Sequence, residues 1–232
     1  DGRPAAAWVR DADGNLGTAE DRSLVFSRLI DRWSAPELLT SLPAAPWTPA
    51  LDFDRDNQPV VAFVVPRADP RTGRPLPADG TAGLLHAARR SAAGWRSQPL
   101  GREISGERPA LRIRPDNHAV VIYRAFGREA GFNPGGEVAA AVADLAEPEP
   151  RWSAAALAAN GGLNVDLAAD LSPVDGGTLV FWEHRDSARA EGEPVMHGVP
   201  QRWEPDLAVA APGLSFSRSE PRPGEGVEVT VW

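Results

Sequence analysis

A short acidic string near the start of the chain contains the residue types that bind calcium. It reads Asp11-Ala12-Asp13-Gly14-Asn15, which places oxygen-bearing side chains at alternate positions around a glycine turn. Asp11, Asp13 and Asn15 are therefore candidate Ca²⁺ ligands. The string lacks the remainder of an EF-hand, because its glycine comes too early and no glutamate follows at the required spacing. The alternative is an ordinary Asp-Gly-Asn turn without a metal.

A second group of carboxylates, Asp52, Asp54 and Asp56, has the residue type that acid–base catalysis needs. On a strand, Asp52 and Asp54 share one face, while Asp56 falls in the turn that follows. The equivalent positions of the next repeat hold Arg112 and Arg114. Opposite charges at equivalent positions favour ion pairs between repeats, or a solvated channel lining, over catalysis.

The other residues with reactive side chains do not form a recognisable catalytic set. Tyr123 is the only tyrosine, and it occupies a position that is aromatic in the other repeats, which favours core packing. The four histidines have no spacing typical of a metal site; they are His86, His118, His184 and His197. No nucleotide-binding or nucleophile motif is present. The sequence predicts no catalytic residue and no cofactor beyond the candidate Ca²⁺.

Two long loops, residues 66–83 and 126–136, are the best candidates for a binding surface. Both join the second and third strands of a repeat, so both are expected on the same face, where loops on a rigid scaffold often bind ligands. Neutral variation in surface loops is the alternative. The side chains singled out are Arg71, Arg74, Phe132 and Asn133.

Composition narrows the function classes. The chain has no cysteine and no lysine, which excludes disulfides, thiolate metal sites, and Schiff-base or P-loop chemistry. A net charge of −8 argues against a nucleic-acid-binding surface. No apolar run approaches the length of about 18 residues that a membrane span requires, so no membrane insertion is expected.

Short strand-like runs recur in the same order along the chain and would position these residues. The most apolar run of each repeat carries an aromatic residue, which predicts a strand that is buried on both faces. These runs are residues 5–9, 60–65, 119–123 and 178–182. In three repeats a strand of alternating polarity precedes this run, and Asp-Asn or Asp-Gly steps that tolerate positive φ predict a hairpin between the two.

A tryptophan follows the third strand of each repeat. The four are Trp33, Trp95, Trp152 and Trp203. Four short antiparallel strands per repeat are typical of a β-propeller blade, and a tryptophan at a fixed place suggests a plug between neighbouring blades. The sequence predicts an all-β fold, a partial propeller of about 3.5–4 blades. Complete blades are expected at about 40–106 and 107–158, and a further one at about 161–210.

The Trp-Ser-Ala-Pro pattern resembles the repeats of sialidase-like (BNR-type) and kelch-like β-propellers of bacterial secreted proteins. The resemblance implies a propeller over roughly residues 5–205. It does not extend to the sialidase Asp-box, a Ser-x-Asp-x-Gly-x-x-Trp turn, because none of the four tryptophan sites has it. The resemblance therefore implies a propeller fold, and the missing Asp-box weakens the implied sialidase activity.

The last stretch differs from the repeats. Pro205-Asp206-Leu207 and the later Pro223-Gly224 turn before Val227 resemble the opening of a CARDB-type immunoglobulin-like domain, a module of bacterial adhesion and cell-surface proteins. We therefore expect propeller blades over 1–204 and the first strands of an Ig-like sandwich over 205–232. The alternative is that residues 207–211 form the outer strand of the last blade.

These observations favour a non-catalytic structural or adhesive module of a large extracellular or cell-surface bacterial protein. Its partners are expected to be a protein or a glycan, together with other blades of a longer parent chain or a second copy that closes the propeller. The alternative is a sialidase-like glycoside hydrolase or lyase whose catalytic residues lie mostly outside this chain.

Overall fold

The computed structural model shows an all-β protein, which confirms the predicted fold class. It describes residues 2–14, 21–45, 49–67, 71, 82–105, 108–125, 137–158, 163–172, 176–185, 195–201, 214–216 and 229–231. Every regular element in these ranges is a strand, so none of them contains a helix that could cross a membrane.

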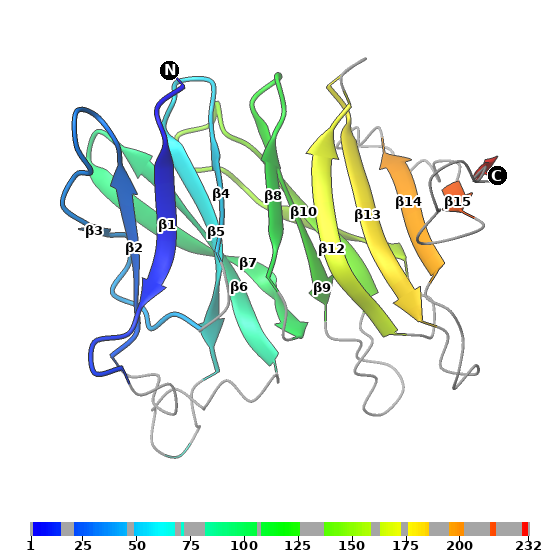
Figure 1. Cartoon of the computed structure of the whole chain (residues 1–232), viewed down its shortest axis with the longest axis horizontal. Coiled ribbons are helices and arrows are strands. Elements are labelled where there is room, and N and C mark those ends of the chain that lie inside the picture. The colour runs from blue at the N-terminus through cyan, green and yellow to red at the C-terminus, as the bar shows by residue number, and fades with distance from the viewer. Residues whose placement is uncertain are drawn as a thin grey trace.

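The strands form four consecutive antiparallel meanders, which we call the first to fourth units (Figure 1). The first unit contains β1 (Ala5–Arg10), β2 (Ser23–Arg28) and β3 (Glu37–Leu38). The second contains β4 (Ala50–Phe53), β5 (Pro59–Pro66), β6 (Ala82–Ser91) and β7 (Gly94–Ser105). The third contains β8 (Ala110–Ile113), β9 (His118–Ala125), β10 (Glu137–Asp144) and β11 (Ser153–Ala158). The fourth contains β12 (Leu163–Leu171), β13 (Thr178–Arg185), β14 (Val195–Gln201), β15 (Leu214–Phe216) and β16 (Val229–Val231).

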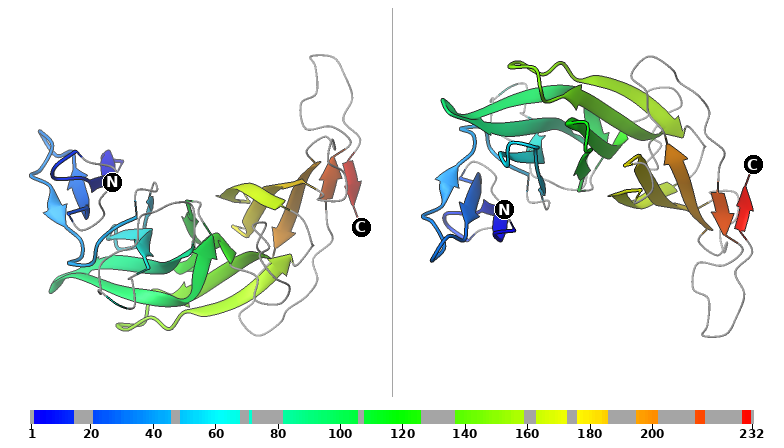
Figure 2. Two further views of the ribbon diagram at one scale, coloured as in Figure 1. Left: turned by 90° about the horizontal axis from the view of Figure 1, so that it is seen from below. Right: turned by 90° about the horizontal axis from the view of Figure 1, so that it is seen from above.

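The units follow one another along an arc (Figure 2). A single backbone pair, Ile104 with Ala125, connects the second unit to the third, so the two remain separate meanders within one continuous sheet. The first strands of successive units lie next to each other, β4 beside β8 and β8 beside β12. Figure 2 shows these strands on the concave side of the arc.

Consecutive units pack face to face, and β5 and β9 bury both of their faces. In β5, Val61 and Phe63 face the first unit, whereas Val60 and Ala62 face the third. The described core accordingly divides into three clusters, one at each boundary between units. This confirms the prediction of strands buried on both faces for β5 and β9. The prediction is wrong for β1, which is only partly buried, because no described sheet covers its outer face.

The hairpins that begin the second and third units have the predicted turn chemistry. Asn57 has a φ of 59° and Asn117 a φ of 68°, the left-handed region that Asn tolerates better than most residues. In the fourth unit, Gly176 takes this place with a φ of 70°. The turns also connect the units, since the side-chain oxygen of Asn117 accepts a hydrogen bond from the Arg55 backbone N–H at 3.1 Å.

The repeated tryptophans pack backward onto the preceding unit. Trp95 of the second unit meets Phe26 of the first edge to face, with 5.3 Å between ring centroids. Trp152 packs against the cluster between the second and third units. The interpretation as a buried plug is wrong for Trp33, whose side chain is 51% exposed, because the described residues contain no unit that precedes the first. Trp203 lies outside the described residues.

The strands of the C-terminal stretch continue the sheet of the fourth unit. β15 is hydrogen-bonded to β14, and β16 to β15. The boundary expected at residue 205 stays a prediction, and residues 207–211 lie outside the described part of the chain.

Candidate functional site

Three charged side chains stand on the strands of the concave side, Asp52 on β4, Arg112 on β8 and Asp170 on β12; we call them the inner row. One carboxylate oxygen of Asp52 accepts a hydrogen bond from the backbone N–H of Ile113 at 2.8 Å, across the boundary between units. Arg112 reaches Asp170 across the next boundary, with 3.4 Å between Nε and Oδ1. The inner row therefore joins the second unit to the third and the third to the fourth.

The pKa of the Asp170 carboxyl lies below its usual value. A hydrogen bond from the Leu171 backbone N–H is the largest cause, and the nearby charge of Arg112 adds to it. A lowered pKa means that the carboxylate is held in its charged form. Ion pairs between repeats were expected at the positions of Asp52 and Arg112, but the partner found for Arg112, Asp170, was not singled out from the sequence.

Asp54 stabilises a turn and is not free for chemistry. The carboxylate is buried, and Oδ2 contacts the Arg89 guanidinium at 2.8 Å. Oδ1 accepts hydrogen bonds from the backbone N–H groups of Asp56 and Gln58. Asp54 thereby satisfies the donors of the turn that precedes β5, and its charge is compensated by Arg89.

The acidic string near the N-terminus gains a third carboxylate in the fold. Ligand atoms of Asp11, Asp13 and Asp21 lie within 4.8 Å of one another. Asp21 Oδ2 accepts hydrogen bonds from the backbone N–H groups of Ala12 and Asp13, and Asp11 pairs with Arg22. Burial acts to raise the pKa of Asp21, but these hydrogen bonds outweigh it and lower the pKa. Asn15, the third predicted ligand, lies outside the described residues.

The sequence did not point to Asp21 because it lies eight residues beyond Asp13, outside the alternate spacing of the acidic string. Three carboxylates with neighbouring oxygens are a plausible donor set for Ca²⁺, which prefers oxygen ligands. The carboxylate oxygens that could bind Ca²⁺ also accept hydrogen bonds within the loop. The contacts seen here therefore fit both the calcium interpretation and the turn interpretation.

The remaining residues singled out from the sequence are dispersed. Tyr123 is fully buried between the second and third units, as expected for a core position. His86 is buried on β6 beside the Phe63 ring, and this burial lowers its pKa. His118 is the first residue of β9 and lies near Asp116. The side chains of His184 and His197 are outside the described part.

Of the predicted binding-loop residues, the structure describes only one. Arg71 is exposed to solvent. Arg74, Phe132 and Asn133 lie outside the described residues, so the loops stay a prediction as a binding surface.

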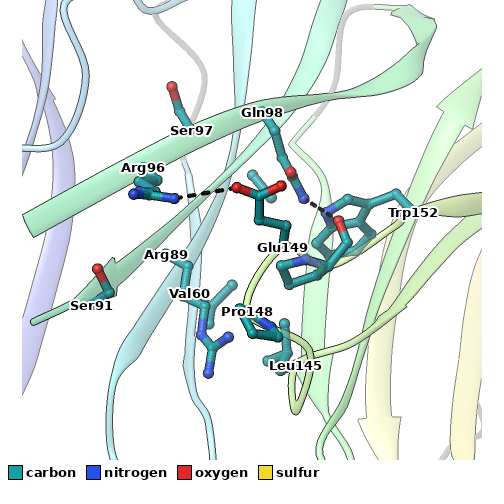
Figure 3. A pocket seen from close by; sticks show the side chains of 12 residues that line it. Val60, Arg89, Ser91, Arg96, Ser97, Gln98, Leu145, Pro148, Glu149 and Trp152 are labelled. Atoms are coloured by element: carbon teal, nitrogen blue, oxygen red, sulfur yellow. Dashed lines mark hydrogen bonds and ion pairs between the residues drawn. The ribbon is translucent and has the colours of Figure 1, made fainter. Parts of the chain in front are cut away.

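A pocket that the sequence did not indicate lies between the second and third units (Figure 3). It has a volume of about 250 Å³. The buried side chains of Val60, Ala87 and Leu145 contribute apolar surface, and the Trp152 indole forms another part of the lining. Arg96 and Gln98 line the side formed by β7 (Figure 3).

Comparison with known proteins gives no family for this chain. No protein-family model matches it, and no curated protein matches its sequence. Among solved structures it is similar to an exo-beta-1,3-galactanase from Phanerochaete chrysosporium with beta-1,3-galactotriose, at a TM-score of 0.47 and 11% identity over 91% of this chain and 53% of that one. It is also similar to an N-acetylgalactosamine deacetylase from F. plautii in complex with blood group B trisaccharide, at a TM-score of 0.40 and 12% identity over 77% of this chain and 57% of that one.

The chain thus spans little more than half the length of either structure. With TM-scores below 0.5, neither comparison assigns a fold family or an activity.

Proposed function

We propose that this chain is a non-catalytic scaffold or adhesive module, a β-propeller portion of about 3.5–4 blades that belongs to an extracellular or cell-surface protein. The observation that carries the proposal is the use of charged side chains between units. Two side chains of the inner row make contacts across unit boundaries, Asp52 with the Ile113 backbone N–H and Arg112 with Asp170, and the third carboxylate considered, Asp54, is paired with Arg89 within the second unit.

The propeller part of the proposal is supported by the packing of successive units. The first strands of the second, third and fourth units lie side by side, and each of these units packs one face onto the unit before it. Trp95 and Trp152 make this backward contact in two successive units. Such radial packing of four-stranded antiparallel sheets is the architecture of a propeller.

The outer face of the first unit supports the expected partner. Trp33 is 51% exposed, and Ile30 and Leu38 of the same unit are 59% and 53% exposed. In the next two units the corresponding tryptophan is packed against a preceding sheet. We therefore propose that a further four-stranded unit, from the parent chain or a second copy, covers this face.

Oligomeric state tests this partner. If a second copy provides the covering unit, the chain should dimerise in sedimentation experiments and Trp33→Ser should shift it to monomer. A chain that is monomeric at high concentration would leave a unit of the parent as the partner.

Binding and turnover assays test the function itself. The purified chain should bind members of a glycan array, or a protein captured from the cell surface, and release no fluorophore from a panel of fluorogenic glycosides. Hydrolysis by the chain, abolished by Asp52→Asn with the fold retained, would replace the scaffold proposal with a glycosidase.

A further inference from the structure

At the boundary between the first and second units, the repeated tryptophan has both a ring to pack against and an acceptor for its indole N–H. The Phe26 ring of β2 packs edge to face against Trp95. Beside it, the Trp95 indole Nε1–H donates to Glu37 Oε2 of β3 at 3.1 Å. Arg90 contacts the same carboxylate at 3.0 Å. The Phe26 ring thus packs against the Trp95 ring, and the Glu37 carboxylate accepts the hydrogen bond of its indole N–H.

Strand register identifies the equivalent positions at the next boundary. Phe26 pairs with Ala7 on one side and with Glu37 on the other. In the second unit, Ala87 pairs with Ala62 on one side and with Gln98 on the other.

The aromatic neighbours of these alanines confirm the alignment. Ala7 precedes Trp8 and Ala62 precedes Phe63, the aromatic residues that correspond in the repeat. Ala87 therefore stands where the first unit has Phe26, and Gln98 where it has Glu37.

The pocket is the consequence of these two replacements. Ala87 is too small to fill the space that Phe26 fills, and both Ala87 and Trp152 line the pocket of about 250 Å³ (Figure 3). The Gln98 amide donates to the Pro150 carbonyl at 2.9 Å. The buried Trp152 Nε1 has no hydrogen-bond partner among the described residues. The boundary between the second and third units thus lacks both the aromatic ring and the carboxylate that contact the tryptophan at the boundary between the first and second units.

A basic side chain at the edge of the pocket can pair with an anionic group. Arg96 lies two residues before Gln98 on β7, and its side chain is 68% exposed. Its contact with Glu149, itself 87% exposed, is long at 3.6 Å. Glu149 also lines the pocket, so a ligand carboxylate would compete with it for Arg96. Exposed ion pairs of this kind contribute little stability, so the existing contact is a weak competitor.

We propose that this pocket binds a small aromatic carboxylate. The aryl ring occupies the space beside Ala87, Val60 and Leu145 and packs against Trp152, as Phe26 packs against Trp95. The carboxylate lies at the edge of the pocket near Arg96. A cavity of about 150 Å³ suffices for a benzene ring, so the volume found leaves room for the carboxylate and a short linker.

Nuclear magnetic resonance of the complete chain tests the proposal directly. The probe is phenylacetate, and the readout is the indole Nε1–H resonance of Trp152, assigned by its loss in Trp152→Phe. Phenylacetate should shift this resonance in a saturable manner, with a Kd on the order of 1 mM for a ligand of this size. Benzyl alcohol, which lacks the charge, should bind more weakly.

Two variants locate the ligand. Ala87→Phe restores the arrangement of the first boundary and should weaken binding at least about tenfold, a change of about 1.4 kcal/mol. Arg96→Gln is a surface change that leaves the core intact, and it should weaken phenylacetate about two- to fivefold, as expected for an exposed ion pair, while leaving benzyl alcohol unaffected.

Several outcomes would overturn the proposal. They are no shift at about 20 mM phenylacetate, far above the expected Kd; equal binding by Arg96→Gln; and a shift caused by neutral monosaccharides instead of phenylacetate. Because Arg96 is exposed, its variant remains informative even if Ala87→Phe fails to fold. The first two outcomes leave the scaffold function untouched, and a shift with monosaccharides would instead point to glycan binding in this pocket. The array and hydrolysis assays test the scaffold function separately.

Discussion

Replacement of Trp95 by alanine should destabilise the chain markedly, whereas the same replacement of Trp33 should not. The two residues hold equivalent positions in the repeat, but within the described part of a single chain only Trp95 has a neighbouring unit to pack against. Its ring contacts Phe26, and its indole N–H donates to Glu37. The comparison therefore isolates the contact between units from the intrinsic effect of removing a tryptophan.

The magnitude follows from the burial and contacts of Trp95. A fully buried tryptophan costs about 3–5 kcal/mol on truncation to alanine. Trp95 is partly buried, which reduces this to about half, and the edge-to-face pair with Phe26 adds about 0.5–1 kcal/mol. The expected loss is about 2–3 kcal/mol for Trp95→Ala, against about 0.5 kcal/mol for an exposed residue such as Trp33.

Thermal and urea unfolding followed by far-UV circular dichroism measure both losses without relying on tryptophan fluorescence. For a chain of this length, each kcal/mol corresponds to about 2–4 °C in Tm. Trp95→Phe should recover part of the stability, because it keeps an apolar ring and loses only the N–H donor to Glu37. Equal losses for Trp95→Ala and Trp33→Ala would refute the idea that the tryptophans act by backward packing.

Three further perturbations test other parts of the structure. Asn117→Ala should lose about 2–3 kcal/mol of stability in a urea titration. The loss combines left-handed backbone strain of about 1–2 kcal/mol with the lost hydrogen bond from the Arg55 backbone N–H, of about 1 kcal/mol. Asn57→Ala, which adds only the strain, should lose less in the same titration. Burial lowers the pKa of His86, so below about pH 6.5 the unfolded chain binds more protons than the folded chain. The Tm should therefore fall between pH 7.5 and 5, more steeply than the Tm of His86→Gln. Parallel Tm profiles for the two proteins would contradict this. Millimolar Ca²⁺, but not Mg²⁺, should raise Tm, and Asp21→Asn should remove the increase; a Tm unchanged by Ca²⁺ would show that the acidic string is a turn only.

The strands and their hairpins could be predicted from the sequence because the signals are local. The apolar runs with an aromatic residue at 60–65 and 119–123 became the buried strands β5 and β9, and the Asp-Asn steps placed Asn57 and Asn117 at positive φ. Such features depend on neighbours within a few residues. The burial of each tryptophan could not be predicted in this way, because it depends on a unit some 60 residues away: Trp95 has that unit and Trp33 does not.

The candidate sites were only partly predictable, because they depend on chain segments that meet in space. Asp21 joins Asp11 and Asp13 through the hairpin between β1 and β2, and Asp170 meets Arg112 across a unit boundary. Neither partner has a recognisable spacing in the sequence. The opposite charges at equivalent positions of the repeat indicated that Arg112 would pair with an acidic residue. Which residue this is could be identified only from the structure, which places Asp170 of β12 beside it.

The pocket illustrates how an internal repeat can acquire a site without a motif. When several units pack in the same way, equivalent residues at successive boundaries can be compared. Here Phe26 and Glu37 of the first unit are compared with the residues at the same positions of the second unit. Replacement of the first by Ala87 and of the second by Gln98 leaves a cavity, which costs stability unless the packing relaxes or a ligand fills it. Ala140 occupies the same register position in the third unit, facing the fourth. A small residue at this position is therefore shared by the second and third units, which sets both apart from the first unit with its Phe26.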